Sequence, residues 1–352
     1  MSRRRKETPL NQRELPDVVR EKARPPVAII LGSPTDVTHC LSFLDRIETT
    51  CFQMDLYQAQ RLHAELTGQH PAARVVTEAD LWDLPPRFQT VLYLPARSGE
   101  RELKIDMVEQ AYHILQPHGT FFVWSPYMSD PFFANLLKKI FGRVHAPHLD
   151  GDTVLWCRRE GDRSRRRHEV TFQARVAGGP ACRFLSRPGV FSYGRFDNGA
   201  RALVETMTVH NGDRVLDLGC GCGTNGVFAA QRTGTAGQIT FVDSNVRAIA
   251  LAEINARGNG VTDFQTVATS QVEGLQEGSF DVVLANPPYY ANSSIARLFL
   301  TRSRQLLTPD GRFYVVTKQV QETADLMMET FENVEAWMHR GYTILSNTPL
   351  SS

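Results

Sequence analysis

Short apolar runs alternate with polar segments of helical length along this chain. In the second half the runs cover residues 215–218, 238–242 and 282–285, and each is too short for a buried helix. Glycine, aspartate or proline ends each run, as expected where a strand meets a loop. Helices are predicted after the first run, from about residue 226, and before it, over residues 200–207. Strands that alternate with helices build a parallel sheet, so the pattern predicts an α/β fold.

The pattern occurs twice. Residues 88–95 align with residues 280–287 at an offset of 192 (280 − 88), and at the same offset residues 113–124 align with residues 305–316. Each pair contains a strand, a helix, a Pro-x-Gly turn and a second strand. Two blocks that share one offset indicate duplication. We therefore predict two tandem Rossmann-like domains.

Composition shifts place the domain boundaries. We expect a disordered basic tail over residues 1–24, a first domain over residues 25–157, an arginine-rich linker over residues 158–180 and a second domain over residues 181–352. The linker opens with six arginines between Arg158 and His168, against two acidic residues. Such a run is typical of a solvated linker, and phosphate contact is the alternative because arginine pairs with phosphate bidentately.

A glycine-rich loop follows the strand at residues 215–218. Gly219, Gly221 and Gly223 let the backbone turn sharply and approach a ligand, as in dinucleotide-binding folds. Asp217, two residues before the first glycine, would repel a diphosphate but suits an ammonium or sulfonium group. Asp243 ends the next strand, where an acidic residue is placed to accept hydrogen bonds from both ribose hydroxyls.

The sequence Asn-Pro-Pro-Tyr begins at Asn286, directly after the apolar run 282–285. The side-chain carbonyl of Asn286 and the backbone carbonyl of Pro287 are two acceptors for an –NH2 group. Tyr289 offers a flat face to a planar ring. These groups are suited to holding an exocyclic amine while it attacks an electrophile.

The three motifs, in this order, resemble the class I S-adenosylmethionine (AdoMet)-dependent methyltransferases. The resemblance implies AdoMet as cofactor and no metal. It implies catalytic roles for Asn286, Pro287, Pro288 and Tyr289. The cofactor-binding residues that it implies are Asp217, Gly219, Cys220, Gly221, Gly223, Asp243, Ser244, Thr269, Ser270 and Asn286.

One position departs from the family pattern. Such enzymes often place Asp or Asn after the third strand to bind the adenine amino group. Here residues 267–271 offer only the hydroxyls of Thr269 and Ser270, or backbone. Phe264 or Val242 could add apolar contact to the adenine ring, and core packing explains both equally well.

Residues 185–199, with Pro-Gly-Val-Phe-Ser followed by Asp and Gly, are similar to a segment of the ribosomal RNA guanine-N2 methyltransferases, which also have a duplicated domain. This resemblance covers about residues 70–345. It implies that Phe191 and Asp197 border the methionine end of the cofactor and the target base, with Tyr289 and Tyr290 stacking near it. Phe191 could instead be core, and Asp197 could instead cap the following helix.

The implied function is methyl transfer from AdoMet to the exocyclic N2 amine of a guanine in ribosomal RNA (rRNA methylation during rRNA processing). Asn-Pro-Pro-Tyr also occurs in enzymes that methylate adenine N6 in nucleic acid or a protein glutamine amide, so these remain alternatives. A non-catalytic RNA-binding assembly factor is a further alternative. An in-line attack by the held amine needs positioning more than a dedicated base.

The first half lacks these groups. Residues 27–36 keep one glycine of the loop and have Ile30 where Asp217 stands, and Leu94 to Arg97 replace Asn-Pro-Pro-Tyr. We therefore expect the first domain to be a degenerate scaffold or RNA-recognition domain, and the second to be catalytic.

Composition adds few constraints. The chain has 352 residues, 42% hydrophobic and 22% charged, with a net charge of +1, so RNA contact requires a local patch. Its six cysteines are scattered without a C-x-x-C pair, which argues against zinc and for a reducing compartment. No stretch approaches a membrane span. We expect a cytoplasmic monomer whose partner is ribosomal RNA or a ribosomal subunit.

Overall fold

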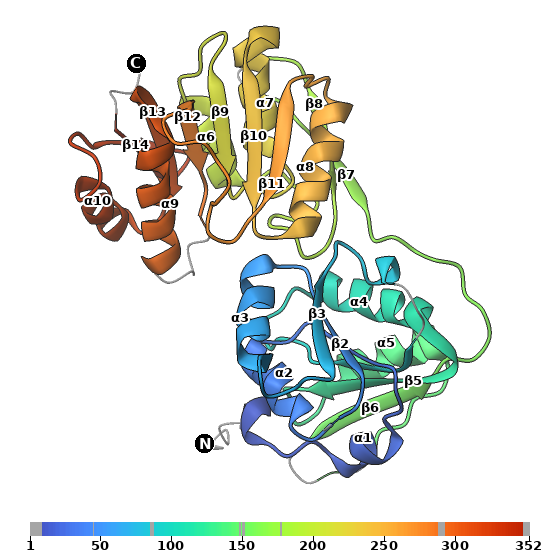
Figure 1. Ribbon diagram of the computed structural model, residues 1–352. Helices are drawn as coiled ribbons and strands as arrows, with labels where there is room; N and C mark the ends of the chain where they lie inside the picture. The colour runs from blue at the N-terminus through green and yellow to red at the C-terminus, as the bar shows by residue number, and fades with distance from the viewer. Residues whose placement is uncertain are drawn as a thin grey trace, which may run out of the picture. The chain divides into compact units, whose positions relative to one another are not determined.

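The chain folds into two compact units, each with its own sheet (Figure 1). The computed structural model describes residues 9–44, 46–84, 88–147, 149, 152–176, 178–287 and 293–347. The first unit is Met1–His168 and the second is Glu169–Ser352.

The first unit contains a sheet of six strands in the order β3-β2-β1-β4-β5-β6. All neighbouring strands are parallel except β6, which is antiparallel to β5. The strands are β1 (Val27–Ile30), β2 (Thr49–Gln53), β3 (Ala73–Thr77), β4 (Phe88–Tyr93), β5 (Leu115–Ser125) and β6 (Thr153–Arg158). The helices are η1 (Leu10–Gln12), α1 (Asp17–Lys22), α2 (Pro34–Leu41), α3 (Leu56–Leu66), η2 (Leu81–Asp83), α4 (Arg101–Ile114) and α5 (Pro131–Phe141).

Helices cover both faces of this sheet. Helices α4 and α5 pack on one face, and α1, α2 and α3 pack on the other. The central strand β1 is buried on both faces and is apolar at all four positions, as a parallel strand between two helical layers must be.

Residues 9–24 differ from the predicted disordered tail. They form η1 and α1, and the side chains of Leu10, Leu15, Val19 and Ala23 are buried in the core under α2. Leu15 lies between the two helices and Ala23 follows α1, so the four side chains come from different elements. Their burial in one core docks the segment onto the first unit.

The second unit contains a sheet of seven strands in the order β11-β10-β9-β12-β13-β15-β14, and a separate hairpin of β7 and β8. The strands are β7 (Val170–Ala174), β8 (Cys182–Ser186), β9 (Arg214–Leu218), β10 (Gln238–Asp243), β11 (Phe264–Ala268), β12 (Phe280–Ala285), β13 (Leu307–Thr317), β14 (Glu335–His339) and β15 (Tyr342–Ser346). The helices are α6 (Asn198–Thr206), α7 (Thr224–Thr233), η3 (Gly234–Ala236), α8 (Val246–Gly258), α9 (Ser293–Leu306) and α10 (Val320–Met328).

The order of the first five strands is the same in both units, and so are the helical layers. In the second unit α6, α7 and α8 pack on one face of the sheet, and α9 and α10 pack on the other. The prediction of two tandem Rossmann-like domains is confirmed.

The offset of 192 holds element by element. It carries β4 onto β12, α4 onto α9 and β5 onto β13 with both ends matched. It also carries the irregularity in the β4–β5 pairing, between Phe88 and Thr90, onto that between Phe280 and Val282 in β12–β13. A shared bulge at a shared offset is strong structural evidence for duplication, because bulges are features of a particular strand pair.

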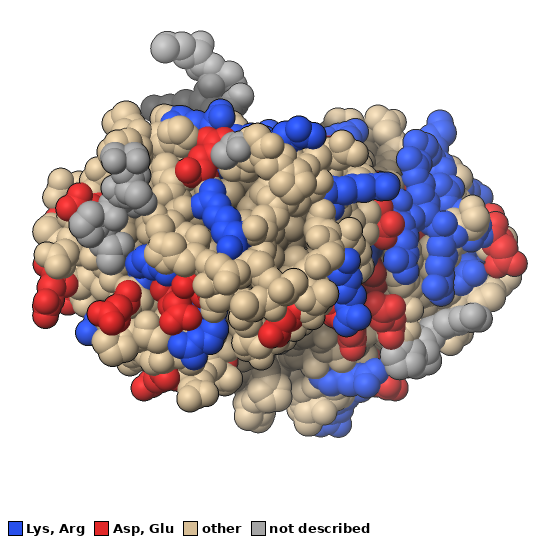
Figure 2. Space-filling view, turned by 90° about the horizontal axis from the view of Figure 1, so that it is seen from above, with Lys and Arg blue, Asp and Glu red and all other residues tan. Residues whose placement is uncertain are grey.

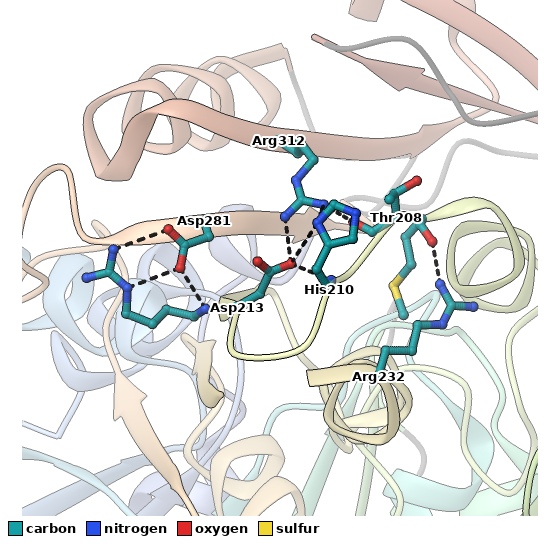
Figure 3. A network of polar contacts seen from close by, with 8 residues as sticks. Thr208, His210, Asp213, Arg232, Asp281 and Arg312 are labelled. Carbon is teal, nitrogen blue, oxygen red and sulfur yellow. Dashed lines mark hydrogen bonds and ion pairs between the residues drawn. The ribbon is translucent and has the colours of Figure 1, made fainter. Parts of the chain in front are cut away.

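Polar side chains fasten the edge of the second sheet where its strands begin (Figure 3). Arg312 of β13 donates to the carboxylate of Asp213 (2.6 Å) and to the carbonyl of Thr208 (3.1 Å). Arg214 of β9 donates two hydrogen bonds, of 3.1 and 3.2 Å, to Asp281 of β12. These contacts tie the α6–β9 connection to β13 and tie β9 to β12, at the opposite end of the strands from the predicted site residues.

Candidate functional site

The predicted site residues follow the carboxyl ends of four parallel strands in the second unit. The ends are in register: Leu218 of β9 pairs with Val242 of β10 and with Ala285 of β12, and Asp243 pairs with Ala268 of β11. The chain proceeds from β9 to β10 on one side and reaches β12 on the other. Ligands of open α/β sheets bind where the strand order reverses in this way.

The glycine loop turns back onto strand β10. The backbone N–H groups of Gly219 and Cys220 both donate to the carbonyl of Val242, at 2.8 and 2.9 Å. Gly219 has a φ of 71°, and a Cβ atom there would lie 3.2 Å from the ring of Phe299. Backbone conformation and the nearby ring of Phe299 therefore both favour glycine at the first position of the motif.

Asp217 is fully buried beneath the first turn of α7. Its carboxylate accepts a hydrogen bond of 2.8 Å from the backbone N–H of Gly226 and one of 3.5 Å from the side-chain amide of Asn225. Burial raises the pKa of Asp217 from 3.8 to about 7; the bonds from Gly226 and Asn225 oppose this shift, and the charge of Asp243 adds to it. Asp217 thus joins strand β9 to the helix that carries the loop.

Two further residues complete this contact, and the sequence analysis assigned a role to neither. A Cβ atom on Gly226 would lie 2.3 Å from the ring of Phe241, so α7 can approach the sheet only with glycine here. The side-chain oxygen of Asn225 is buried without a hydrogen-bond partner among the described residues. Buried carbonyl oxygens next to a carboxylate form a site that attracts a donor or a cation.

Asp243 connects the loop with the helix that follows β10. Its two oxygens accept hydrogen bonds of 2.9 Å from the backbone N–H groups of Gly221 and Asn245. Its backbone carbonyl accepts from the N–H of Thr269 (3.0 Å) at the end of β11. Ser244 is half-buried between these groups. The structure therefore brings Gly221, Asp243 and Thr269 together, as the motif order predicted.

The side chain of Thr269 has a local role in the turn after β11. Its hydroxyl accepts from the backbone N–H groups of Gln271 (3.3 Å) and Glu273 (3.2 Å), and Ser270 beside it is half-buried. Phe264 is the first residue of β11, at the end of the strand away from the site. It packs edge-on against Phe241. These contacts favour core packing, the alternative role given to Phe264.

The structure brings Asp197 and Asn286 together across 89 positions of sequence. The side-chain N–H of Asn286 donates to Oδ1 of Asp197 at 3.2 Å. The same oxygen accepts from the backbone N–H of Ala200 at 2.9 Å, so Asp197 is also the N-cap of α6. The two roles considered for Asp197 are compatible, since a carboxylate oxygen can accept two hydrogen bonds.

Phe191 lies on the surface, with 47% of its area exposed, and is not a core residue. Its segment is fastened to the start of α8: the side chain of Asn245 donates to the carbonyl of Gly189 (2.8 Å), and Arg247 donates to that of Pro188 (2.6 Å). Arg247 is fully buried. Of these contacts, the cap is visible in the sequence, because an Asn before a helix is a recognisable cap signal.

Two asparagines of α8, Asn255 and Asn259, hold the hairpin that leads to Phe191. Asn255 of α8 accepts from the backbone N–H of Leu185 (2.7 Å) and donates to its carbonyl (2.9 Å), and it also donates to the carbonyl of Cys222 (2.8 Å). One turn later, Asn259 makes the equivalent pair with Arg183. The two amides replace a neighbouring strand along β8, and Asn255 connects the hairpin to the glycine loop.

Part of the predicted site lies outside the described residues. Asn286 and Pro287 are described and half-buried. Pro288, Tyr289 and Tyr290 fall outside the described ranges.

The same positions in the first unit have lost these groups. The pairing of β1 with β4 matches that of β9 with β12, and it places Ile29 rather than Ile30 at the position of Asp217. The sequence alignment was displaced by one residue because the loops after the two strands differ. Leu94, the counterpart of Asn286, is buried, and its Cβ lies 3.0 Å from where a Cβ of Gly32 would be.

Gln53 of β2 replaces Asp243. The pairing of Ile30 with Phe52 corresponds to that of Leu218 with Val242, and Gln53 follows Phe52. Its side-chain amide donates to the carbonyl of Gly32 at 3.2 Å, so a loop contact is kept without a charge.

Other chemistry has little support within the described ranges. They contain no group of three or more side chains that could hold a metal ion. Cys220 and Cys222 are buried, and burial raises the pKa of both thiols, that of Cys222 to about 12. Neutral thiols are poor metal ligands and nucleophiles. None of the described helices is both long and apolar enough to cross a membrane.

Comparisons with known proteins agree with this geometry. Residues 181–346 match the family described as methyltransferase small domain. A ribosomal RNA small subunit methyltransferase C from Marinomonas sp. (strain MWYL1) is 34% identical over 159 residues, which cover 42% of this chain and 44% of that protein. The chain thus spans less than half of the length of the first curated relatives that it matches.

Two matches extend over both units. A ribosomal RNA small subunit methyltransferase C from Pseudoalteromonas atlantica is 25% identical over 330 residues, 87% of this chain and 90% of that protein. The solved structure of a T. thermophilus 16S rRNA N2 methyltransferase (RsmC), with AdoMet and guanosine, has a TM-score of 0.74 and 20% identity, covering 94% of this chain and 90% of that one. The second likeness shows the fold.

Proposed function

We propose that this chain, whose residues 181–346 form a methyltransferase small domain, transfers a methyl group from AdoMet to the exocyclic N2 amine of a guanine in ribosomal RNA. The observation that carries the proposal is the contact between Asn286 and Asp197 (3.2 Å). It holds an amide at the end of β12, beside the glycine loop that follows β9.

The residues around the glycine loop fit AdoMet. Asp217 and the side-chain oxygen of Asn225 are acceptors suited to the ammonium of its methionine part. Asp243 has a second lone pair on each oxygen, which suits a ribose diol. Gly221 leaves the loop clear of a side chain at a point where a Cβ atom would meet nothing within 4 Å. When bound, AdoMet supplies a methyl group already activated by a sulfonium.

Asp197 sets the orientation of the Asn286 amide. A carboxylate only accepts hydrogen bonds, so it holds the –NH2 end of Asn286 and turns the side-chain carbonyl the other way. In our proposal this carbonyl and the backbone carbonyl of Pro287 accept the two hydrogens of the target amine. Both acceptors stabilise the positive charge that develops on nitrogen during transfer.

The remaining site roles in this proposal come from the resemblance. Tyr289 stacks on the flipped base, Pro288 and Tyr290 border it, and Phe191 contacts the base or the methionine end from its exposed position. Thr269 and Ser270 lie at the end of β11, on the adenine side. The relatives described as small-subunit rRNA methyltransferases support ribosomal RNA as the partner, and with it a cytoplasmic site of action. That the chain acts as a monomer is part of the proposal and has no separate support.

The decisive experiment is transfer of a tritiated methyl group from AdoMet onto isolated small and large ribosomal subunits, followed by mapping of the labelled nucleotide. We expect label on a guanine N2 of the RNA. Label that appears only on protein or on DNA would contradict the RNA assignment and favour the glutamine amide or adenine N6, which present the same planar –NH2 group. Absence of AdoMet binding at millimolar concentration would favour a non-catalytic assembly factor.

The variant Asn286→Ala separates catalysis from cofactor binding. It removes one acceptor for the amine, so we expect the transfer rate to fall at least a hundredfold, the scale of losing one preorganised polar group at a transition state. The AdoMet dissociation constant in calorimetry should stay within about threefold of wild type. Asn333→Ala, at an exposed position outside the site, is the matched control. Equal loss of AdoMet affinity and rate would contradict this division of roles.

A further inference from the structure

The arginine-rich segment between the units, residues 158–167, is held against the first unit by specific contacts. The predicted linker 158–180 also contains strand β7, so it is not one open connection. Tyr112 of α4 donates to the carbonyls of Glu160 (2.7 Å) and Gly161 (3.1 Å). The guanidinium of Arg163 makes two hydrogen bonds, of 3.1 and 3.2 Å, to the buried carboxylate of Glu109. We refer to residues 158–167 as the arginine segment.

The six arginines of this segment divide into two sets. Arg159 and Arg163 are half-buried and bind the domain itself; Arg159 donates to the carbonyl of Leu115 and pairs with Asp162. The other four are exposed, namely Arg158, Arg165, Arg166 and Arg167. The inner set fastens the segment, and the outer set is presented to solvent.

Aromatic rings order part of the outer set. The guanidinium groups of Arg165 and Arg167 both lie over the ring of Trp82, at 5.7 and 5.9 Å from its centroid. Two cations share one ring, with Arg166 between them in sequence. Of the segment's two acidic residues, Asp162 pairs with Arg159, so positive charge dominates the exposed side. Holding like charges together costs free energy that a bound polyanion would offset.

The positive charge of the segment also affects the pKa of a histidine packed beside it. His113 of α4 lies beneath it, and its pKa is lowered, first by burial and then by the charges of Arg165 and Arg159. Glu109 acts in the opposite direction. On the face in Figure 2, acidic and basic side chains are scattered among other residues, and Lys and Arg gather densely in one place.

We propose that Arg165, Arg166 and Arg167 form a docking surface for the phosphate backbone of RNA, ordered by Trp82 and anchored by Glu109 and Tyr112. This rests on the proposed function for the choice of RNA. All six basic residues of the segment are arginine, whose planar fork binds phosphate oxygens bidentately. The ring that orders two of the guanidinium groups lowers the entropy lost when they bind.

The test is binding of purified small-subunit ribosomal RNA by the full chain across a salt series. The variant is Arg165→Gln, Arg166→Gln and Arg167→Gln combined. Three lost phosphate contacts should lower the slope of log K against log salt by about two to three, and weaken binding about a hundredfold at 0.1 M salt. AdoMet binding and the thermal unfolding temperature should not change.

The matched control removes three exposed arginines that already have carboxylate partners. Arg20, Arg257 and Arg297 pair with Asp17, Glu253 and Glu329, and each is replaced by Gln. We expect RNA affinity within about twofold of wild type. Equal weakening in both triple variants would mean that only net charge matters, and would overturn the proposal. So would an unchanged salt slope in the first variant.

Two further outcomes separate this surface from the proposed activity and from another partner. If wild type methylates no ribosomal RNA but loses RNA binding in the first triple variant, the proposed function fails and the docking surface stands. If wild type methylates RNA and the variant binds RNA normally, the reverse holds. Poly-glutamate bound as tightly as RNA, and lost equally in the variant, would assign the surface to an acidic protein.

Discussion

Replacing Asp217 by Asn should stabilise the second unit at neutral pH while impairing AdoMet binding. The side chain of Asp217 is fully buried, and it accepts hydrogen bonds from the Gly226 N–H and the Asn225 amide. An amide of the same shape still accepts from Gly226. Its –NH2 takes the place of the oxygen that faces Asn225, and the Asn225 amide can turn to accept a hydrogen bond from it. The substitution removes a buried charge and keeps both hydrogen bonds.

The magnitude follows from the pKa. Burial raises the pKa of Asp217 from 3.8 to about 7, roughly three units at about 1.4 kcal/mol each, or about 4 kcal/mol. Because the folded pKa is the higher one, the unfolded state loses its proton first. Stability is therefore complete below about pH 3.8 and declines as the pH rises to about 7. Wild type should carry this penalty at pH 8, and the variant should not.

The assay is urea denaturation from pH 5 to pH 8, read by hydrogen exchange of peptides from β9 and α7. We expect the gain in free energy of unfolding of Asp217→Asn over wild type to grow by about 2–3 kcal/mol across this range. Asp310→Asn, at an exposed position of β13, should show nearly no growth. A gain that does not depend on pH would refute the reasoning, since it would mean that Asp217 is already ionised in the folded state at pH 5.

Two other variants test packing and positioning. Gly226→Ala places a Cβ 2.3 Å from the ring of Phe241, so an overpacking cost of about 1–3 kcal/mol should outweigh the helix propensity gain of about 1 kcal/mol. The control is Gly258→Ala in α8, where a Cβ would meet no atom within 4 Å. In the same urea titration the first variant should lose stability and the control should gain it. Asp197→Asn frees the Asn286 amide to reverse, so kcat of methyl transfer should fall about tenfold to a hundredfold with KM for AdoMet unchanged. A matched rise in KM, or no kinetic change, would contradict a positioning role.

Repeat and motif spacing made much of the fold and site predictable from sequence. The offset of 192 holds for β4, α4 and β5 because a strand–helix–strand unit with fixed turn lengths leaves little freedom in register. The loop glycines and Asp243 meet because carboxyl ends of parallel strands share one edge. Both are consequences of local pattern.

Contacts between segments far apart in the chain were harder to predict from the sequence. The sequence alignment placed Ile30 at the position of Asp217, whereas strand pairing places Ile29 there. Strand pairing is not visible in an ungapped alignment. The docking of the arginine segment depends on Glu109 and Tyr112, about 50 positions earlier, and composition alone suggests a solvated run. The paired amides of Asn255 and Asn259 look like ordinary polar helix positions until β8 is placed beside them.

Comparison of the two units separates what folding requires from what binding requires. The first unit keeps the strand order, the β4–β5 bulge and the backbone turn after β1, where Leu31 has a φ of 56° at the place of Gly219 (71°). A leucine in that conformation costs about 1–2 kcal/mol, so the turn itself is needed for the fold. The opposite holds two residues earlier in the chain. There the first unit buries Ile29 where the second unit buries Asp217. An apolar side chain is sufficient for folding at this position, whereas burial of a carboxylate opposes folding. The fold alone therefore does not account for Asp217 in the second unit, and we propose that the carboxylate serves to bind a cationic group at the glycine loop.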